Sequence, residues 1–112
     1  IVDDFSISGG TLIDVAHMLK ARGAKRIVSV LGHIMLREKG VRAINESPIE
    51  AVISTDSVEN PFIVGQNKFQ TVSVAPLFAE AVYRIHERES VSTLFSTVPQ
   101  KLKDDLKGSC GK

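Results

Sequence analysis

The sequence contains no tryptophan and a single cysteine, Cys110, among its 112 residues. One cysteine excludes an internal disulfide and a cysteine-based zinc site, and we therefore expect a reducing, cytoplasmic setting. Aromatic residues make up 5% of the chain, which is too few to build a platform for stacking nucleic-acid bases. The longest uncharged apolar run, residues 27–36, is too short to cross a bilayer. Neither nucleic acid nor a membrane is therefore an expected partner.

The charges nearly cancel, leaving a formal net charge of +1. No basic field favours nucleic acid, and no acidic block favours disorder. With 43% hydrophobic residues, the chain has the composition of one globular domain. It starts without methionine, in what reads as the middle of a strand, so we expect a fragment that lacks an upstream part.

The first eleven residues, IVDDFSISGGT, organise the rest of the chain. A strand end is followed by the acidic pair Asp3 and Asp4, then by a small-residue loop and a helical pattern. Glycine allows positive φ and close approach of the backbone, and the first amides of a helix lack internal partners. Together these features predict a cradle for a phosphate or another anion. The acidic pair would repel a phosphate, so we expect it to face a sugar's hydroxyls, directly or through a divalent cation.

Strand-like and helix-like segments then alternate along the chain. Further strands are predicted at residues 26–31, 51–55 and 71–74, and further helices at 38–45 and from Ala75 onward. Residues 59–69 read as an exposed connection, and residues 90–95 as a turn or a one-turn helix. This alternation predicts an α/β fold: a mostly parallel sheet of about four strands with helices on both faces. We expect residues 3–11, 32–36 and 55–57, at the carboxyl ends of the strands, to converge on one site.

The motif VDD-x4-GGT, between a strand and a helix, resembles the phosphoribosyl-diphosphate-binding loop of type I phosphoribosyltransferase folds. More specifically, residues 1–95 resemble the C-terminal half of the ribose-phosphate pyrophosphokinase (PRPP synthetase) family. VDDFSISGGT is similar to that family's VDDMIDTGGT. The segments RGAKRIVSVLGH, SPIEAVISTDS and SVAPLFAEAVYRIHERESVSTLF also match, with consistent intervals.

The resemblance implies a function and a set of site residues. The family transfers a diphosphoryl group from Mg-ATP to ribose 5-phosphate, giving PRPP and AMP, and usually forms a hexamer built from dimers. Asp3 and Asp4 would hold the ribose hydroxyls, and residues 8–11 would cradle the 5-phosphate: Ser8, Gly9, Gly10 and Thr11. A regulatory site for ADP or phosphate at a subunit interface would use Ser90, Ser92 and Phe95.

The sequence also departs from the family's pattern. Ile7 replaces the family's loop aspartate, Ser8 replaces its threonine, and Gly32-His33-Ile34 replaces its Thr-His-Gly. The family's ATP-binding and catalytic-loop residues belong to an N-terminal half. We therefore assign no catalytic residue and no metal ligand in this chain, and we expect the chain alone to be inactive. Two alternatives stay open: a catalytically weak regulatory or assembly subunit, and a type I phosphoribosyltransferase.

Simpler structural roles compete with these functional ones. His33 reads as a packed or capping residue, and His17 and His86 as solvated helix positions. Phe95 could pack back on the sheet while the two serines cap a turn. Residues 96–112 read as a flexible polar tail with a solvated lysine-rich stretch, Lys101–Lys107, and an exposed thiol at Cys110.

Overall fold

The computed structural model of the chain describes residues 1–96. It divides into two compact units, residues 1–73 and a second unit from residue 74 onward. The tail that the sequence predicted from residue 96, including Lys101–Lys107 and Cys110, lies outside the described residues except for Ser96. The elements of the first unit are β1 (Val2–Ser6), α1 (Gly10–Ala21), β2 (Val28–Ile34), α2 (Glu38–Glu46), β3 (Ala51–Thr55), the 3-10 helix η1 (Pro61–Ile63) and β4 (Phe69–Val72).

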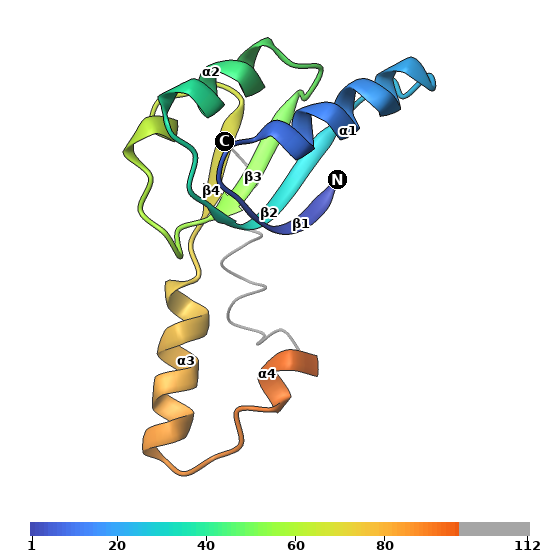
Figure 1. Cartoon of the computed structure of the whole chain (residues 1–112). Coiled ribbons are helices and arrows are strands. Elements are labelled where there is room, and N and C mark those ends of the chain that lie inside the picture. Colours follow the sequence, from blue (N-terminus) through green and yellow to red (C-terminus); the bar gives the residue numbers. More distant parts are fainter. Residues whose placement is uncertain (97–112) are drawn as a thin grey trace. The chain divides into compact units, whose positions relative to one another are not determined.

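The four strands form one sheet in the order β1-β2-β3-β4, and every neighbouring pair is parallel (Figure 1). Val2 pairs with Val30 and Val30 with Ile53, so one row of residues crosses three strands. The predicted α/β class and parallel sheet are confirmed. Because all strands run the same way, their carboxyl ends share one edge, where ligands bind in such sheets. At the opposite edge, before β2 and β3, Arg26 Nε donates a 2.8 Å hydrogen bond to the Glu50 carboxylate. This bond raises the pKa of Arg26.

Helices α1 and α2 cover the same face of this sheet (Figure 1). Successive right-handed crossovers that advance in one direction must place their helices on one side. The core lies under these helices, where Ala16, Ile44 and Val52 are completely buried. On the other face Val30 is 41% exposed and Phe5 48%. The expectation of helices on both faces is therefore corrected for this unit.

The sequence predicted the strand Ala51–Thr55 with its observed bounds, but it misplaced other strand ends. β1 continues through Asp3 and Asp4 to Ser6, although the acidic pair was expected to follow the strand. The strand expected at residues 26–31 is β2 at Val28–Ile34. The strand expected at 71–74 is β4 at Phe69–Val72.

The second unit begins with α3 (Ala75–His86) and continues into the short helix α4 (Thr93–Ser96). Proline in the first turn of α3 suits its start, because that position needs no amide donor. Residues 90–95 were expected to form a turn or a one-turn helix, and α4 supplies that helix at their end. None of the helices described in residues 1–96 is both long enough and apolar enough to span a membrane.

Candidate functional site

A pocket of about 290 Å³ lies at the carboxyl end of β1 and is lined by residues 3–12. It contains all six residues that the sequence analysis assigned to sugar-phosphate binding: Asp3, Asp4, Ser8, Gly9, Gly10 and Thr11. One continuous segment therefore lines this cavity, and it contains the acidic pair, the glycine turn and the start of α1. Their roles in binding stay predictions.

The two carboxylates are exposed, and each accepts a hydrogen bond from the next residue's amide. Asp3 Oδ1 accepts from the Asp4 amide at 2.9 Å, and Asp4 Oδ1 accepts from the Phe5 amide at 3.0 Å. These short local contacts use one oxygen of each side chain. The other oxygen of each carboxylate can therefore accept a bond from a hydroxyl of a ligand.

Gly9 makes the turn between the strand and the helix. Its φ of +80° lies in the left-handed region, which glycine adopts without penalty. Its carbonyl accepts the Ile13 amide at 3.0 Å, and Ser8 Oγ accepts the Gly10 amide at 3.3 Å. The next amides, of Thr11 and Leu12, belong to the first turn of α1 and have no carbonyl partner within the helix. They present donors and partial positive charge to the pocket, which favours an anion.

Two glycines outside the motif let other elements approach this segment closely. A Cβ on Gly40 would lie 2.8 Å from the Ser8 carbonyl oxygen, and one on Gly32 would lie 2.8 Å from the Asp4 carbonyl oxygen. The backbones of α2 and β2 therefore press directly against the loop and β1. Gly32 lies in the range 32–36 that was predicted to converge on the site, whereas Gly40 was not predicted to contribute to it. The available signal was a glycine inside a helix and a glycine inside a strand, both of which cost stability without a packing reason.

A second polar cluster lies beside the pocket, at the carboxyl ends of β2 and β3. His33 Nδ1 is 2.6 Å from Ser57 Oγ, and Ser57 Oγ is 2.7 Å from Thr55 Oγ1. Residues 32–36 and 55–57 thus meet, as expected for carboxyl ends of parallel strands. They contribute His33, Met35 and Ser57 to a cavity of about 380 Å³ that includes Phe5. The expected single site is therefore divided into adjoining pockets, and His33 is an exposed, hydrogen-bonded residue.

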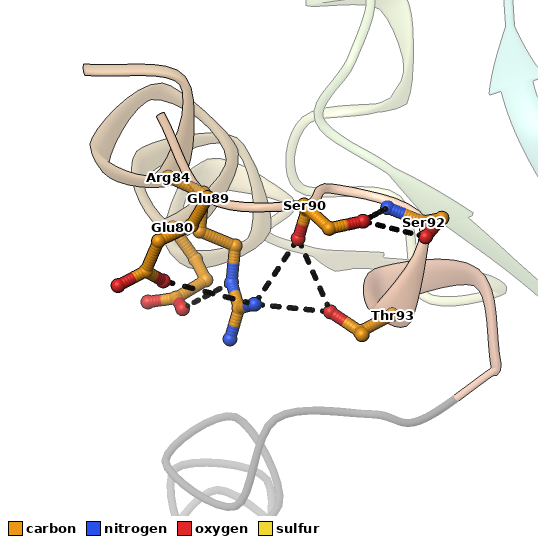
Figure 2. A network of polar contacts seen from close by, with 6 residues as sticks. All are labelled: Glu80, Arg84, Glu89, Ser90, Ser92 and Thr93. Atoms are coloured by element: carbon orange, nitrogen blue, oxygen red, sulfur yellow. Dashed lines mark hydrogen bonds and ion pairs between the residues drawn. The ribbon is translucent and has the colours of Figure 1, made fainter. Parts of the chain in front are cut away.

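In the second unit, Arg84 organises the segment that contains the predicted regulatory residues (Figure 2). Its Nη1 donates to the Ser90 carbonyl at 3.2 Å and to Thr93 Oγ1 at 3.0 Å, while its Nε pairs with Glu80 at 2.8 Å. The hydroxyls of Ser90 and Ser92 lie 2.6 Å apart. The structure therefore brings the two serines together.

Phe95, the third predicted regulatory residue, lies on α4 and is 90% exposed. Whether it packs back on the sheet stays a prediction, because the sheet belongs to the other unit. An aromatic side chain this exposed, close in sequence to two hydroxyls, is available to a ligand or to another protein surface.

Replacing Arg84 by methionine is expected to loosen residues 90–96. Methionine keeps an unbranched apolar stem but loses both hydrogen bonds to the segment, which together are worth about 1–2 kcal/mol at this partly buried position. Amide hydrogen exchange of Thr93, Leu94 and Phe95 should accelerate roughly tenfold. The control is Arg88→Met, which removes an exposed charge of the same sign. Equal exchange rates in both variants would contradict the bracing role of Arg84.

Comparison with protein families gives a match over almost all of the described residues. The model of the phosphoribosyl synthetase-associated domain matches residues 1–96. The chain belongs to this family. The match contains both segments described above, the pocket of residues 3–12 and the segment around Ser90.

Members of the phosphoribosyl synthetase family with curated names are clearly similar to the chain. A ribose-phosphate pyrophosphokinase of Caldanaerobacter subterraneus is 42% identical over 96 residues, which are 86% of this chain and 30% of that protein. The ribose-phosphate pyrophosphokinase of Bacillus subtilis is 38% identical over 96 residues, with the same coverage. The chain thus spans about 30% of the length of these relatives.

A crystal structure of phosphoribosylpyrophosphate synthetase from Mycobacterium smegmatis has a similar fold. Its TM-score is 0.69 at 26% sequence identity, over 78% of this chain and 29% of the other. The α/β architecture of the chain is therefore that of a known phosphoribosyl synthetase.

Proposed function

We propose that the chain is the ribose 5-phosphate-binding, C-terminal part of a ribose-phosphate diphosphokinase. The observation that carries the proposal is the pocket of residues 3–12, whose lining includes the exposed acidic pair, the glycine turn and the start of α1. A sugar phosphate has hydroxyls for the carboxylates and an anionic group for the amides. The names of the curated relatives support the same assignment.

In the proposed reaction, the 1-hydroxyl oxygen of ribose 5-phosphate forms a bond to the β-phosphorus of Mg-ATP. The bond between that phosphorus and the oxygen bridging it to the α-phosphate breaks, so AMP leaves and PRPP forms. The hydroxyl proton is released. In this scheme Asp3 and Asp4 fix the sugar, residues 8–11 fix its 5-phosphate, and the rate comes from this positioning. Charge neutralisation during transfer is supplied by the magnesium ion of the Mg-ATP substrate.

The carboxylates of this pocket are compatible with that role of magnesium. Mg²⁺ is usually held by one or two carboxylates together with substrate phosphates and water, and the pocket offers Asp3 and Asp4. Within residues 1–96 no group of three histidine, cysteine, aspartate or glutamate side chains gathers as a complete metal site. We propose that the ion arrives with ATP.

We also propose that the protein is cytoplasmic, that it assembles into a homo-oligomer, and that it is regulated by a ligand. Ser90, Ser92 and Phe95 would form part of an ADP or phosphate site at an interface between copies in a homo-oligomer. The close pair of hydroxyls and the exposed ring support this assignment. Two adjacent hydroxyls can donate to phosphate oxygens, and an exposed ring can stack on a base.

Binding is tested directly by titrating ribose 5-phosphate into the ¹⁵N-labelled chain. We expect saturable shifts of the Ser8–Thr11 amides with ribose 5-phosphate, weaker ones with inorganic phosphate, and none with ribose at the same concentration. Ribose 5-phosphate that shifts only amides outside residues 3–12 would overturn the assignment of the pocket.

Activity is tested in a chimera. Residues 1–96 replace the aligned segment of the Bacillus subtilis relative, and formation of AMP and PRPP from Mg-ATP and ribose 5-phosphate is measured. Turnover would support the diphosphokinase assignment. A folded chimera that binds ribose 5-phosphate without turnover would instead support the alternative of a regulatory or assembly subunit.

Ile7 is the specific observation behind that alternative. It lines the pocket, where the related sequences' motif has a carboxylate, and it is 58% exposed. Replacing Ile7 by aspartate in the chimera is expected to raise kcat/KM for ribose 5-phosphate about tenfold, because one charged hydrogen bond contributes about 1.5 kcal/mol. Ile7→Asn is the uncharged control. Equal kinetics for the Ile7→Asp variant and the unmodified chimera would contradict a limiting role for the lost carboxylate.

A further inference from the structure

The carboxyl end of β2 is paired with β1 over a longer stretch than with β3. The backbone pairing of β1 with β2 continues to Ile34, whereas the pairing of β2 with β3 ends at Leu31. Gly32 and His33 therefore lie beyond the last pair of the β2–β3 ladder, although both still lie beside β1. On the side of β3, side chains take the place of the ladder.

Two hydroxyl groups at the end of β3 reach this part of β2. Thr55 Oγ1 lies 2.5 Å from the Gly32 carbonyl oxygen, and Ser57 Oγ lies 3.2 Å from the same oxygen. The two hydroxyl oxygens are 2.7 Å apart, and Ser57 Oγ is 2.6 Å from His33 Nδ1. These contacts tie Gly32 and His33 to the end of β3. We refer to Thr55, Ser57 and His33 as the β2–β3 brace.

The brace is satisfied best when His33 donates a hydrogen bond. Each hydroxyl group has one hydrogen, so Thr55 and Ser57 alone can fill only two of the four contacts in the network. A hydrogen on His33 Nδ1 fills the contact with Ser57 Oγ. The Ser57 hydroxyl is then free to donate to Thr55 or to the Gly32 carbonyl. The imidazole is therefore an integral member of the brace.

The acidic pair of the pocket lies directly beside this part of β2. Asp3 pairs with Leu31, so the next residues along the two strands, Asp4 and Gly32, lie opposite each other. A Cβ on Gly32 would lie 2.8 Å from the Asp4 carbonyl oxygen, so the two backbones are in close contact. A shift of Gly32 would therefore displace Asp4.

The glycine loop has a different support. The Ser8 carbonyl oxygen is approached by Gly40 of α2, where a Cβ would lie 2.8 Å away. The two parts of the pocket, the acidic pair and residues 8–11, are thus backed by separate elements. A change in the brace should displace the acids and leave the amides of residues 8–11 in place.

We propose that Thr55, Ser57 and His33 are positioning residues of the sugar site. They hold Gly32, and through it they hold Asp4 where its carboxylate accepts a ribose hydroxyl. None of the three contacts the sugar phosphate in this scheme. Binding groups need such support, because a small displacement from the productive geometry is costly. The inference rests on the proposed function and adds three residues to its site.

The test compares Thr55→Val with Thr71→Val in the ¹⁵N-labelled 112-residue chain. Valine keeps the branched shape of threonine and lacks the hydroxyl, and Thr71→Val makes the same change at an exposed position of β4. In Thr55→Val we expect the affinity for ribose 5-phosphate to fall about tenfold, the share of one displaced carboxylate. Affinity for inorganic phosphate at residues 8–11 should not fall. Thr71→Val should change neither affinity by more than about twofold.

Thr55→Ser provides the rescue, because serine restores the hydroxyl without the methyl group. Its affinity for ribose 5-phosphate should lie within about threefold of that of the unmodified chain. Ser57→Ala gives a second, milder variant that keeps the contact between Thr55 and Gly32. It should lower the affinity for ribose 5-phosphate about threefold, again without loss of phosphate binding. This variant decides the question if Thr55→Val fails to fold.

Three outcomes would overturn the proposal. Equal affinity of Thr55→Val and Thr71→Val for ribose 5-phosphate would show that the brace does not position the acid. A Thr55→Ser chain as weak as Thr55→Val would show that the hydroxyl is not the group responsible. Equal proportional losses of phosphate and ribose 5-phosphate in Ser57→Ala would show that the brace supports the fold as a whole and not the sugar site.

The unmodified chain separates this inference from the proposed function. If it does not bind ribose 5-phosphate at residues 3–12, the sugar-phosphate assignment fails and the positioning role fails with it. If ribose 5-phosphate binds there and loss of the hydroxyls has no selective effect, the positioning role fails alone.

Discussion

Replacing Gly40 by alanine is expected to lower the free energy of unfolding by about 1–2 kcal/mol and to displace the loop that contains Ser8. The new Cβ would lie 2.8 Å from the Ser8 carbonyl oxygen and 3.0 Å from Leu36 Cδ2. A backbone oxygen cannot move aside as a flexible side chain can, so α2 and the loop must separate. Overpacking of this kind costs about 1–3 kcal/mol. Alanine otherwise stabilises a helix interior by up to about 1 kcal/mol relative to glycine. A lower free energy of unfolding in the Gly40→Ala variant would therefore be due to the clash.

Gly10→Ala is the matched control, because Gly10 also lies in a helix beside Ser8. Its Cβ would meet only Ser8 Oγ, at an ordinary 3.6 Å. We expect this variant to unfold at the same denaturant concentration as the unmodified chain or at a higher one. Urea unfolding followed by circular dichroism gives both free energies, and amide shifts of residues 8–11 report the loop. A Gly40→Ala chain as stable as Gly10→Ala would show that α2 does not support the loop.

Gly40 illustrates which parts of the site the sequence could predict. The pocket of residues 3–12 is built from one continuous segment, so a local pattern of strand, carboxylates, glycines and helix was enough to find it. Gly40 approaches the Ser8 carbonyl from α2, and Gly32 approaches the Asp4 carbonyl from β2. Their proximity depends on the register of β2 against β1 and on how α2 packs, and a local pattern contains neither.

In the fold, too, some features follow from the local sequence and others from pairing between distant segments. The β-branched run at residues 51–55 is bounded by Pro48 and by the polar residues after Thr55, and its limits were predicted as observed. In β1 the pairing of Asp3 with Leu31 extends the strand through residues of low strand propensity. The strand order, which places α1 and α2 on one face, follows from pairing between distant segments.

Helix α3 shows how much a periodic apolar pattern in the sequence can predict. Its apolar stripe predicted a helix, and a helix is observed at Ala75–His86. No residue of α3 is buried, however, and Val82 and Ile85 are 66% and 67% exposed. An apolar stripe therefore predicts that a helix forms, because the period is local, but it does not identify what covers the stripe.

Replacing both acids of the pocket, Asp3→Asn/Asp4→Asn, is expected to weaken ribose 5-phosphate binding about 100-fold. Each hydrogen bond to a charged group contributes about 1.5–3 kcal/mol, and tenfold in affinity corresponds to about 1.4 kcal/mol. Asparagine keeps the shape of aspartate, and its Oδ1 can still accept the amides of Asp4 and Phe5 that the carboxylates accept now. The fold should therefore be retained, and isothermal titration calorimetry should isolate the loss of sugar binding.

Inorganic phosphate provides the decisive comparison, because the expected change has the opposite sign. The two carboxylates repel a bare anion in the same pocket, so their neutralisation should strengthen phosphate binding at residues 8–11 while sugar-phosphate binding falls. Asp14→Asn/Glu46→Gln, which removes two exposed charges outside the pocket, should change neither affinity by more than about twofold at about 0.15 M salt. The Asp3/Asp4 variant could instead lose affinity for both phosphate and ribose 5-phosphate. That result would mean that the two acids support the structure of the loop. The assignment of the sugar to the carboxylates and of the phosphate to the amides would then be wrong.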